Sequence, residues 1–145
     1  MGICGTAMAH VALLLREMGH IVSGVDGKFF DPIATLLKKS NVQTYEGYNV
    51  DRLKQLSLDL VIVGNAISRG NVELEYLLRK RIIPFYSFPE FLSNQLFRKR
   101  NMWVVTGTHG KTTTTSLLAF LLKTVCKPGY LIGGLPKNFT CGCSL

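Results

Sequence analysis

One stretch decides the fold class of this 145-residue chain: Trp103-Val-Val-Thr-Gly-Thr-His-Gly-Lys-Thr-Thr-Thr114. Its apolar beginning predicts a buried strand over 102–106, and the apolar residues that follow predict a helix over 112–124. Glycines between a strand and a helix let successive backbone N–H groups converge on phosphate oxygens at the positive end of the helix. The stretch therefore predicts a nucleotide-phosphate loop over 107–113.

The residue types in this loop indicate how it works. In a loop of this kind the lysine, Lys111, reaches the β- and γ-phosphates and is the predicted catalytic residue, while the Thr112 hydroxyl ligates Mg²⁺. The strict pattern has a further glycine where this chain has Val105, so the loop is a variant that fits ATP or GTP. We interpret His109 as shaping the loop or facing the substrate. The predicted cofactor-binding residues are Gly107, Thr108, His109, Gly110, Lys111, Thr112 and Thr113.

Upstream of the loop, strand-like and helix-like segments alternate. Predicted helices cover 7–18, 32–40, 71–79 and 89–97, and predicted strands cover 20–25, 42–45, 58–63 and 82–86. Alternation at this pitch argues for a parallel α/β sheet. The prediction is a Rossmann-like domain over 1–99, followed by the beginning of a P-loop ATPase domain over 100–145. We expect both ends to be truncated, because a buried strand should precede the turn at Gly2 and a P-loop domain needs further strands.

A second glycine turn lies at the start of the chain, Gly2-Ile-Cys-Gly-Thr-Ala-Met8. A helix, a strand and Asp26 follow it, which is the order of a dinucleotide fingerprint: a turn and a helix N-terminus for a diphosphate, then an acid for a ribose. Cys4 and Met8 break the usual spacing. A purely structural turn therefore explains these residues equally well.

The segment 64–71 leaves the carboxyl end of a predicted central strand, the edge at which open α/β sheets bind ligands. Ser68, Arg69 and Asn71 offer hydroxyl, guanidinium and amide donors suited to a diphosphate. The alternative is that Asn71 is the N-cap of the next helix, with Glu73 and Glu75 complementing the helix dipole. Both roles can hold at once.

Composition narrows the class of protein further. The chain is 47% hydrophobic and 18% charged, with a net charge of +8, which suits a globular protein with phosphate-bearing partners. We interpret the basic runs 79–81 and 98–100 as helix ends and turns, and expect no nucleic-acid partner. A signal peptide and a membrane-length apolar run are both lacking, so we expect a cytoplasmic protein without a membrane partner. The four cysteines are expected to be free thiols.

Five segments span almost the whole chain. They are Gly-Ile-Cys-Gly-Thr-x-Met at 2–8, Ser-Gly-Val-Asp at 23–26, Gly-Asn-Ala-x-x-Arg-Gly-Asn at 64–71, Gly-Thr-His-Gly-Lys-Thr-Thr-Thr at 107–114 and Ile-Gly-Gly-x-Pro-x-Asn-Phe at 132–139. In this order they resemble the N-terminal part of the Mur ligases, the ATP-dependent amide-forming family of peptidoglycan synthesis.

The resemblance implies a Rossmann-like domain for a UDP-sugar, a central P-loop ATPase and a C-terminal domain. It implies ATP and Mg²⁺ as cofactors, UDP-N-acetylmuramate as one substrate, and a peptide or amino acid as the other. Within the family, segments 64–66 and 133–139 resemble members that attach L-alanyl-γ-D-glutamyl-meso-diaminopimelate; attachment of L-alanine is the alternative. By match, the residues on the UDP-sugar side are Gly2, Gly5, Thr6, Asp26, Ser68, Arg69 and Asn71.

This chain departs from the family pattern in ways that affect its expected activity. It lacks the first strand, has Val72 where a proline often follows Asn71, and stops before the family's acidic magnesium ligand, modified lysine and C-terminal domain. We therefore expect the segment to be inactive as a ligase on its own. A nucleotide-binding module without catalysis is the alternative from another functional class.

Overall fold

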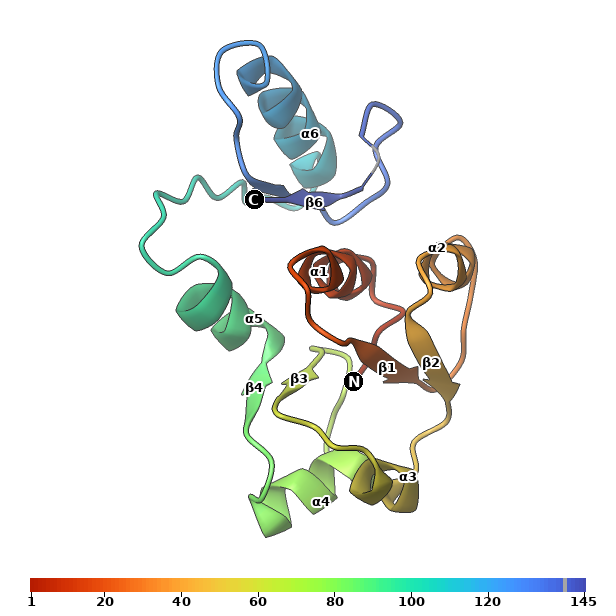
Figure 1. The fold of residues 1–145 in the computed structure, drawn as a ribbon. Helices are drawn as coiled ribbons and strands as arrows, with labels where there is room; N and C mark the ends of the chain where they lie inside the picture. Colours follow the sequence, from red (N-terminus) through yellow and green to blue (C-terminus); the bar gives the residue numbers. More distant parts are fainter. Residues whose placement is uncertain (140) are drawn as a thin grey trace.

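The computed structural model describes residues 1–139 and 141–145 and confirms the parallel α/β organisation. Helices and strands alternate along the first two thirds of the chain, and a separate helix with a two-stranded hairpin follows (Figure 1). The elements are α1 (Thr6–Glu17), β1 (Ser23–Asp26), α2 (Ile33–Lys39), β2 (Gln43–Glu46), α3 (Val50–Gln55), β3 (Val61–Val63), α4 (Val72–Lys80), β4 (Phe85–Ser87), α5 (Phe88–Phe91), η1 (Leu92–Leu96), α6 (Lys111–Leu122), β5 (Tyr130–Leu131) and β6 (Cys143–Ser144).

The strands of the first region form two parallel pairs, β1 with β2 and β3 with β4. Two residues connect the pairs. The Met1 amine donates to the Ile62 carbonyl at 2.8 Å, the Gly64 N–H donates to the Met1 carbonyl at 3.0 Å, and the Gly2 N–H donates to the Val25 carbonyl at 2.8 Å. Met1 and Gly2 therefore lie between β1 and β3, at the position predicted for the end of a first strand. The loops that follow β1, β2 and β3 therefore lie at one edge of the strands.

Helices cover both sides of these strands: α1 and α2 lie on one side, and α3 and α4 on the other (Figure 1). Successive side chains of β3 point to opposite faces, as a strand requires. Val61 and Val63 pack with Leu53 and Leu77 on the α3–α4 side, whereas Ile62 packs with the cluster that contains α1 and α5. Because helices cover both faces of β3, its residues are apolar on both faces, which explains the apolar run at 58–63 in the sequence.

The second region differs from prediction in two places. Residues 102–106 form no strand: Trp103 and Val104 are 71% and 74% exposed, and no described strand lies beside them to pair with their backbone. The predicted buried strand before the phosphate loop is therefore wrong for this structure. Tyr130–Leu131 form β5, which pairs antiparallel with β6, a strand that the sequence did not indicate.

Two further differences occur in the first region. The sequence reasoning did not predict α3, although Asn49 caps it by accepting hydrogen bonds from the N–H groups of Asp51 and Arg52. The single helix predicted over 89–97 is a short α-helix, α5, continued by a π-helical turn, η1. The aromatic residues of this part of the chain pack inward: Phe91 is buried, and Phe85, Tyr86 and Phe88 pack against the core clusters.

Candidate functional site

The glycine turn at the start of α1 is held in place by Asp26 at the end of β1. One carboxylate oxygen, Oδ2, accepts from the Cys4 N–H at 2.8 Å, and the other, Oδ1, accepts from the Gly27 N–H at 2.7 Å. The N-cap of α1 is Gly5, which provides no side-chain cap, and the first turn has no acidic residue. The first-turn N–H groups of a helix lack intrahelical partners, so this end of α1 can receive an anion.

The predicted residues of the turn have different environments. Gly2 is buried and its N–H is bonded to Val25, so it supports the turn from inside. Gly5 is exposed and Thr6 is half-buried, so these two lie where a ligand can approach. The φ angle of Gly2 is +76°, a conformation that favours glycine.

The segment 64–71 packs directly on this turn. A Cβ atom on Gly64 would lie 3.0 Å from the Met1 carbonyl oxygen and 3.2 Å from the Met8 methyl group, so a larger residue would push the segment and the turn apart by a few tenths of an ångström. Beyond it, Ser68 and Arg69 are exposed. The structure thus brings the turn, Asp26 and the 64–71 segment to the same edge of the strands.

Asn71 has the capping role considered from the sequence. Its side-chain oxygen accepts from the N–H groups of Glu73 and Leu74, each at 3.1 Å. The amide NH₂ group remains as a donor for a ligand. Glu73 and Glu75 lie in the first turn of α4, but the Glu73 side chain is 2% exposed and its carboxylate is paired with Arg52 at 2.9 Å, so its charge is shared between the helix end and this pair.

The sequence reasoning missed the loop after β2, which lies between Asp26 and Glu73. The Tyr48 hydroxyl donates to Asp26 Oδ1 at 3.4 Å, and the Asn49 N–H donates to Glu73 Oε1 at 2.8 Å. Burial, and secondly the negative charge of Asp26, raise the pKa of Tyr48 to about 12, so it stays a neutral donor. The capping pattern at 49–52 was the signal that could have revealed this loop.

The predicted phosphate loop lies at the start of α6, and all seven of its residues are exposed. Gly107 and Gly110 have φ angles of +149° and +78°, which glycine adopts without strain. The Lys111 ammonium donates to the carbonyls of Gly107 at 2.6 Å and Thr108 at 3.1 Å. As at α1, the helix has no side-chain cap and no acid in its first turn. These features fit a phosphate group with an accompanying cation.

Two side chains that flank Lys111 in the loop, those of His109 and Thr112, make contacts of their own. His109 Nδ1 lies 3.2 Å from the Thr108 hydroxyl oxygen, a contact that is consistent with shaping the loop. A Cβ atom on Gly134 would lie 2.9 Å from Thr112 Cγ2, so the turn after β5 rests on the loop. The Thr112 methyl group thus faces this turn.

The two glycine loops are separate, and His10 lies between their regions. This α1 side chain is fully buried, and neither ring nitrogen has a hydrogen-bond partner within 1–139 and 141–145. A Cβ atom on Gly142 would lie 2.2 Å from His10 Nδ1 and 2.7 Å from the Gly134 carbonyl oxygen. Burial lowers the pKa of His10, which favours a neutral ring. His10 is thus a packing contact that joins α1 to the β5–β6 hairpin.

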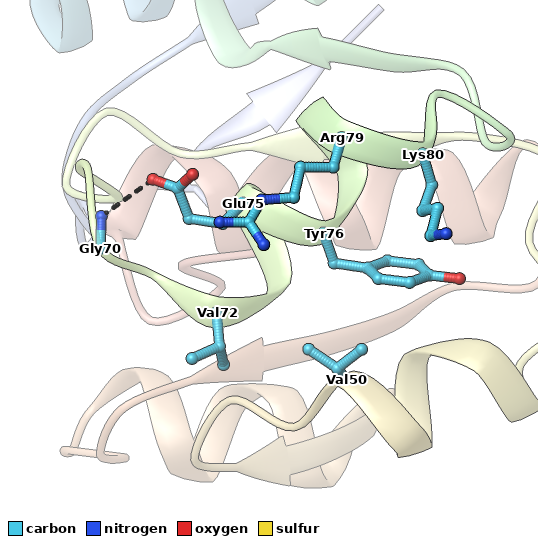
Figure 2. Close-up of a pocket in the computed structure, with 7 residues that line it drawn as sticks. All are labelled: Val50, Gly70, Val72, Glu75, Tyr76, Arg79 and Lys80. Carbon is cyan, nitrogen blue, oxygen red and sulfur yellow. Dashed lines mark hydrogen bonds between the residues drawn. The ribbon is translucent and has the colours of Figure 1, made fainter.

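A shallow hollow of about 400 Å³ lies over the outer side of α3 and α4 (Figure 2). Glu75 Oε1 accepts from the Gly70 N–H at 3.2 Å at one end of it, and Arg79 and Lys80 lie along α4. None of the predicted substrate residues lines it. The hollow is therefore distinct from the edge that carries the glycine turn and Asp26.

Among the described residues, no group of three or more His, Cys, Asp or Glu side chains is arranged to hold a metal ion. No described helix combines the length and the apolar character needed to cross a membrane.

Comparisons with known proteins match this arrangement. The profile described as "Mur ligase family, catalytic domain" matches residues 1–100. UDP-N-acetylmuramate–L-alanyl-γ-D-glutamyl-meso-2,6-diaminoheptandioate ligase of Escherichia coli K12 is 44% identical over 140 residues, covering 96% of this chain and 30% of that protein. UDP-N-acetylmuramate–L-alanine ligase of Endomicrobium trichonymphae is 40% identical over 138 residues, covering 94% and 30%.

Solved structures agree with the sequence comparisons. The murein peptide ligase of Psychrobacter arcticus superimposes with a TM-score of 0.86 at 41% identity, covering 99% of this chain and 32% of that one. The present chain spans about 30% of the length of the curated relatives named above. The family profile covers more than two thirds of the chain, and the relatives extend the match through the phosphate loop. This chain belongs to the Mur ligase family.

Proposed function

We propose that this chain is the nucleotide-sugar-binding and ATP-binding part of a ligase that joins a murein tripeptide to UDP-N-acetylmuramate in the cytoplasm. The observation that carries the proposal is the Asp26 carboxylate bound to the Cys4 N–H. This bond holds the glycine turn open at the N-terminus of α1. The tripeptide, rather than L-alanine, is favoured by the higher identity to the relative named for it, 44% against 40%.

In the proposed sugar site, three loops each have a role. The N-terminus of α1, with Gly5 and Thr6, faces the diphosphate, while Gly2 supports the turn through its backbone. Asp26 accepts from the ribose, since each of its oxygens retains lone pairs after the bonds described above. The last loop supplies donors to the remaining phosphate oxygens, namely Ser68, Arg69 and Asn71.

In the proposed ATP site, the loop over 107–113 binds the phosphates. Lys111 exchanges its bonds to the Gly107 and Thr108 carbonyls for phosphate oxygens, and the first-turn N–H groups of α6 supply further donors. The Thr112 hydroxyl is the residue that holds Mg²⁺. When bound, ATP supplies the phosphoryl group that activates the muramate carboxylate for attack by the peptide amine.

Titration calorimetry with UDP-N-acetylmuramate tests the sugar site. We expect a saturable heat at up to about millimolar ligand, and weaker binding by Arg69→Ala, because one charge-assisted donor is lost. The control is Lys28→Ala, which removes another exposed cation and should leave the affinity unchanged. The absence of any heat or chemical-shift response at millimolar ligand in the folded protein would count against the proposal.

Binding of a non-hydrolysable ATP analogue tests the phosphate loop. Lys111→Ala should abolish it, whereas Lys127→Ala, an exposed lysine beyond α6, should leave it unchanged. Analogue binding without any UDP-N-acetylmuramate binding would instead favour a nucleotide-binding module from outside the ligase function.

A further inference from the structure

The Glu73 carboxylate is a buried junction between two loops of the proposed sugar site. It is 1% exposed, and its Oε1 accepts from the Asn49 N–H at 2.8 Å and from Arg52 Nη2 at 2.9 Å. Glu73 is the second residue of α4, whereas Asn49 and Arg52 belong to α3 and its cap. One oxygen atom thus ties the beginnings of two helices together.

Arg52 holds the same loop from its other end. The nitrogen that donates to Glu73 also donates to the Gly47 carbonyl at 2.6 Å, and the guanidinium lies 4.8 Å from the centre of the Tyr45 ring. The loop after β2 is therefore bound both at its first residue, Gly47, and at its last, Asn49. Since its backbone is fixed at both ends, Tyr48 has little freedom to move.

These contacts form a continuous path between two predicted substrate residues. Tyr48 contacts Asp26 through its hydroxyl, and the next residue, Asn49, contacts Glu73. The Glu73 N–H donates to Asn71 Oδ1. Asp26 and Asn71 are thus connected through the loop after β2 and through Glu73, although neither contacts the charged groups of the ion pair.

The energetics argue that this pair contributes more than stability. A buried ion pair has to offset the desolvation of both charges, and apolar residues of similar volume often stabilise a protein as well or better. The pair also leaves Glu73 Oε2 buried without a hydrogen-bond partner among the described residues, a further cost. A geometric role accounts for such an arrangement better than a stabilising one.

We infer that Arg52 and Glu73 are positioning residues for the UDP-sugar site, holding the 64–71 segment at a set distance from Asp26. This inference rests on the proposed function. On this inference, affinity for the nucleotide sugar depends on Arg52 and Glu73, although neither side chain contacts the ligand.

Three variants test the inference. Arg52→Met removes both of the arginine's hydrogen bonds and should weaken UDP-N-acetylmuramate binding about tenfold, because misplaced groups lose much of their effect. Glu73→Gln keeps an oxygen that can accept both bonds, so it should stay within about threefold of the parent chain. The double variant Arg52→Met/Glu73→Gln should bind as weakly as Arg52→Met, and it leaves no unpaired buried charge if the single variant fails to fold.

The chain offers a matched control on the same helix. Lys54 and Asp51 form an exposed ion pair at 2.8 Å, and Asp51→Asn/Lys54→Met should change sugar affinity by less than about twofold. Affinity is measured well below the thermal transition of each variant, together with ATP-analogue affinity. A role in folding alone would alter both affinities or neither, whereas positioning alters only the sugar affinity.

The outcomes separate the two proposals. If the parent chain binds UDP-N-acetylmuramate and the folded double variant binds equally well, the positioning inference is overturned while the function stands. If the parent chain binds no UDP-N-acetylmuramate, both are overturned. A tenfold loss confined to the sugar nucleotide supports both.

Discussion

Helices α1 and α6 begin in the same way and end up in opposite environments. Each has 12 residues, follows a glycine loop, and lacks both a side-chain cap and an acid in its first turn. In α1 the seven consecutive residues from Met8 to Leu14 are buried; in α6 only Ala119 is buried. The local pattern therefore specifies the loop and the helix, whereas burial depends on what packs against them.

The exposed side of α6 is strongly apolar. Leu117, Phe120 and Leu121 are 58%, 47% and 54% exposed, and the preceding extended segment adds Trp103 and Val104. Apolar side chains exposed to this extent on one helix are usually covered in a folded protein. The comparison thus shows that α1 completes its packing within this chain, while the described residues do not complete that of α6.

The largest expected effect comes from the difference in burial between the two helices. Leu14→Ala in α1, where Leu14 is 5% exposed, should lower the free energy of unfolding by about 2–5 kcal/mol through lost burial and a cavity. The same change at Leu121 in α6 should stay within about 0.5 kcal/mol. Urea denaturation of both variants measures the difference. Equal losses would mean that α6 is packed as tightly as α1.

The helices and strands of the first region were largely predictable, because amphipathic helices and turn residues alternate there. The four predicted strands are present within a few residues, with β1, β3 and β4 shorter than predicted, and the four predicted helical segments are present, the last as α5 continued by η1. The failure at 102–106 has a physical cause: an apolar run predicts a strand only if a neighbouring strand pairs with it, and pairing is not a local property.

The candidate site was partly predictable for the same reason. Glycines and strand ends mark the turn at Gly2, the loop at 64–71 and the phosphate loop, since each is a local pattern. The Arg52–Glu73 pair spans 21 residues. Nothing in the sequence around Arg52 indicates that Glu73 is its partner, because that pairing depends on how α3 and α4 pack.

The next prediction tests the contact between the two regions. Gly142→Ala should cost about 1–3 kcal/mol, because its Cβ would overlap His10 and force α1 and the hairpin apart. Gly133→Ala, which meets nothing within 4 Å, is the matched control and should be nearly neutral. Adding His10→Ala should restore part of the loss. No recovery in the double variant would show that His10 is not the obstacle.

The same contact predicts a pH dependence. Burial lowers the pKa of His10 below its ordinary value of 6.5, so the unfolded chain binds a proton more readily than the folded one. Stability should therefore fall as the pH decreases below about 6.5, and this part of the slope should vanish in His10→Asn. The N-terminal amine, whose pKa burial lowers to about 6, has the same sign but is present in both proteins. Unfolding curves between about pH 5 and pH 8 give the difference, and parallel curves would argue against a neutral buried ring.

The smallest expected effect concerns the missing caps themselves. Gly5 has a φ of −62°, and a Cβ there would meet only ordinary contacts at 3.5 Å and 3.8 Å, so serine fits. Gly5→Ser should raise the free energy of unfolding by a few tenths of a kcal/mol, because its hydroxyl caps the first turn of α1. The same hydroxyl should weaken UDP-N-acetylmuramate binding, since it competes for the N–H groups proposed to hold the diphosphate.

The corresponding change in α6 should behave differently. Gly110 has a φ of +78°, so Gly110→Ser introduces backbone strain and should destabilise the loop in place of capping it. A gain in stability together with a loss of sugar affinity at position 5 would indicate that α1 lacks a cap because its N-terminus binds ligand. A gain in stability with unchanged affinity would place the diphosphate elsewhere, and the two helix starts would then share a pattern without sharing a role.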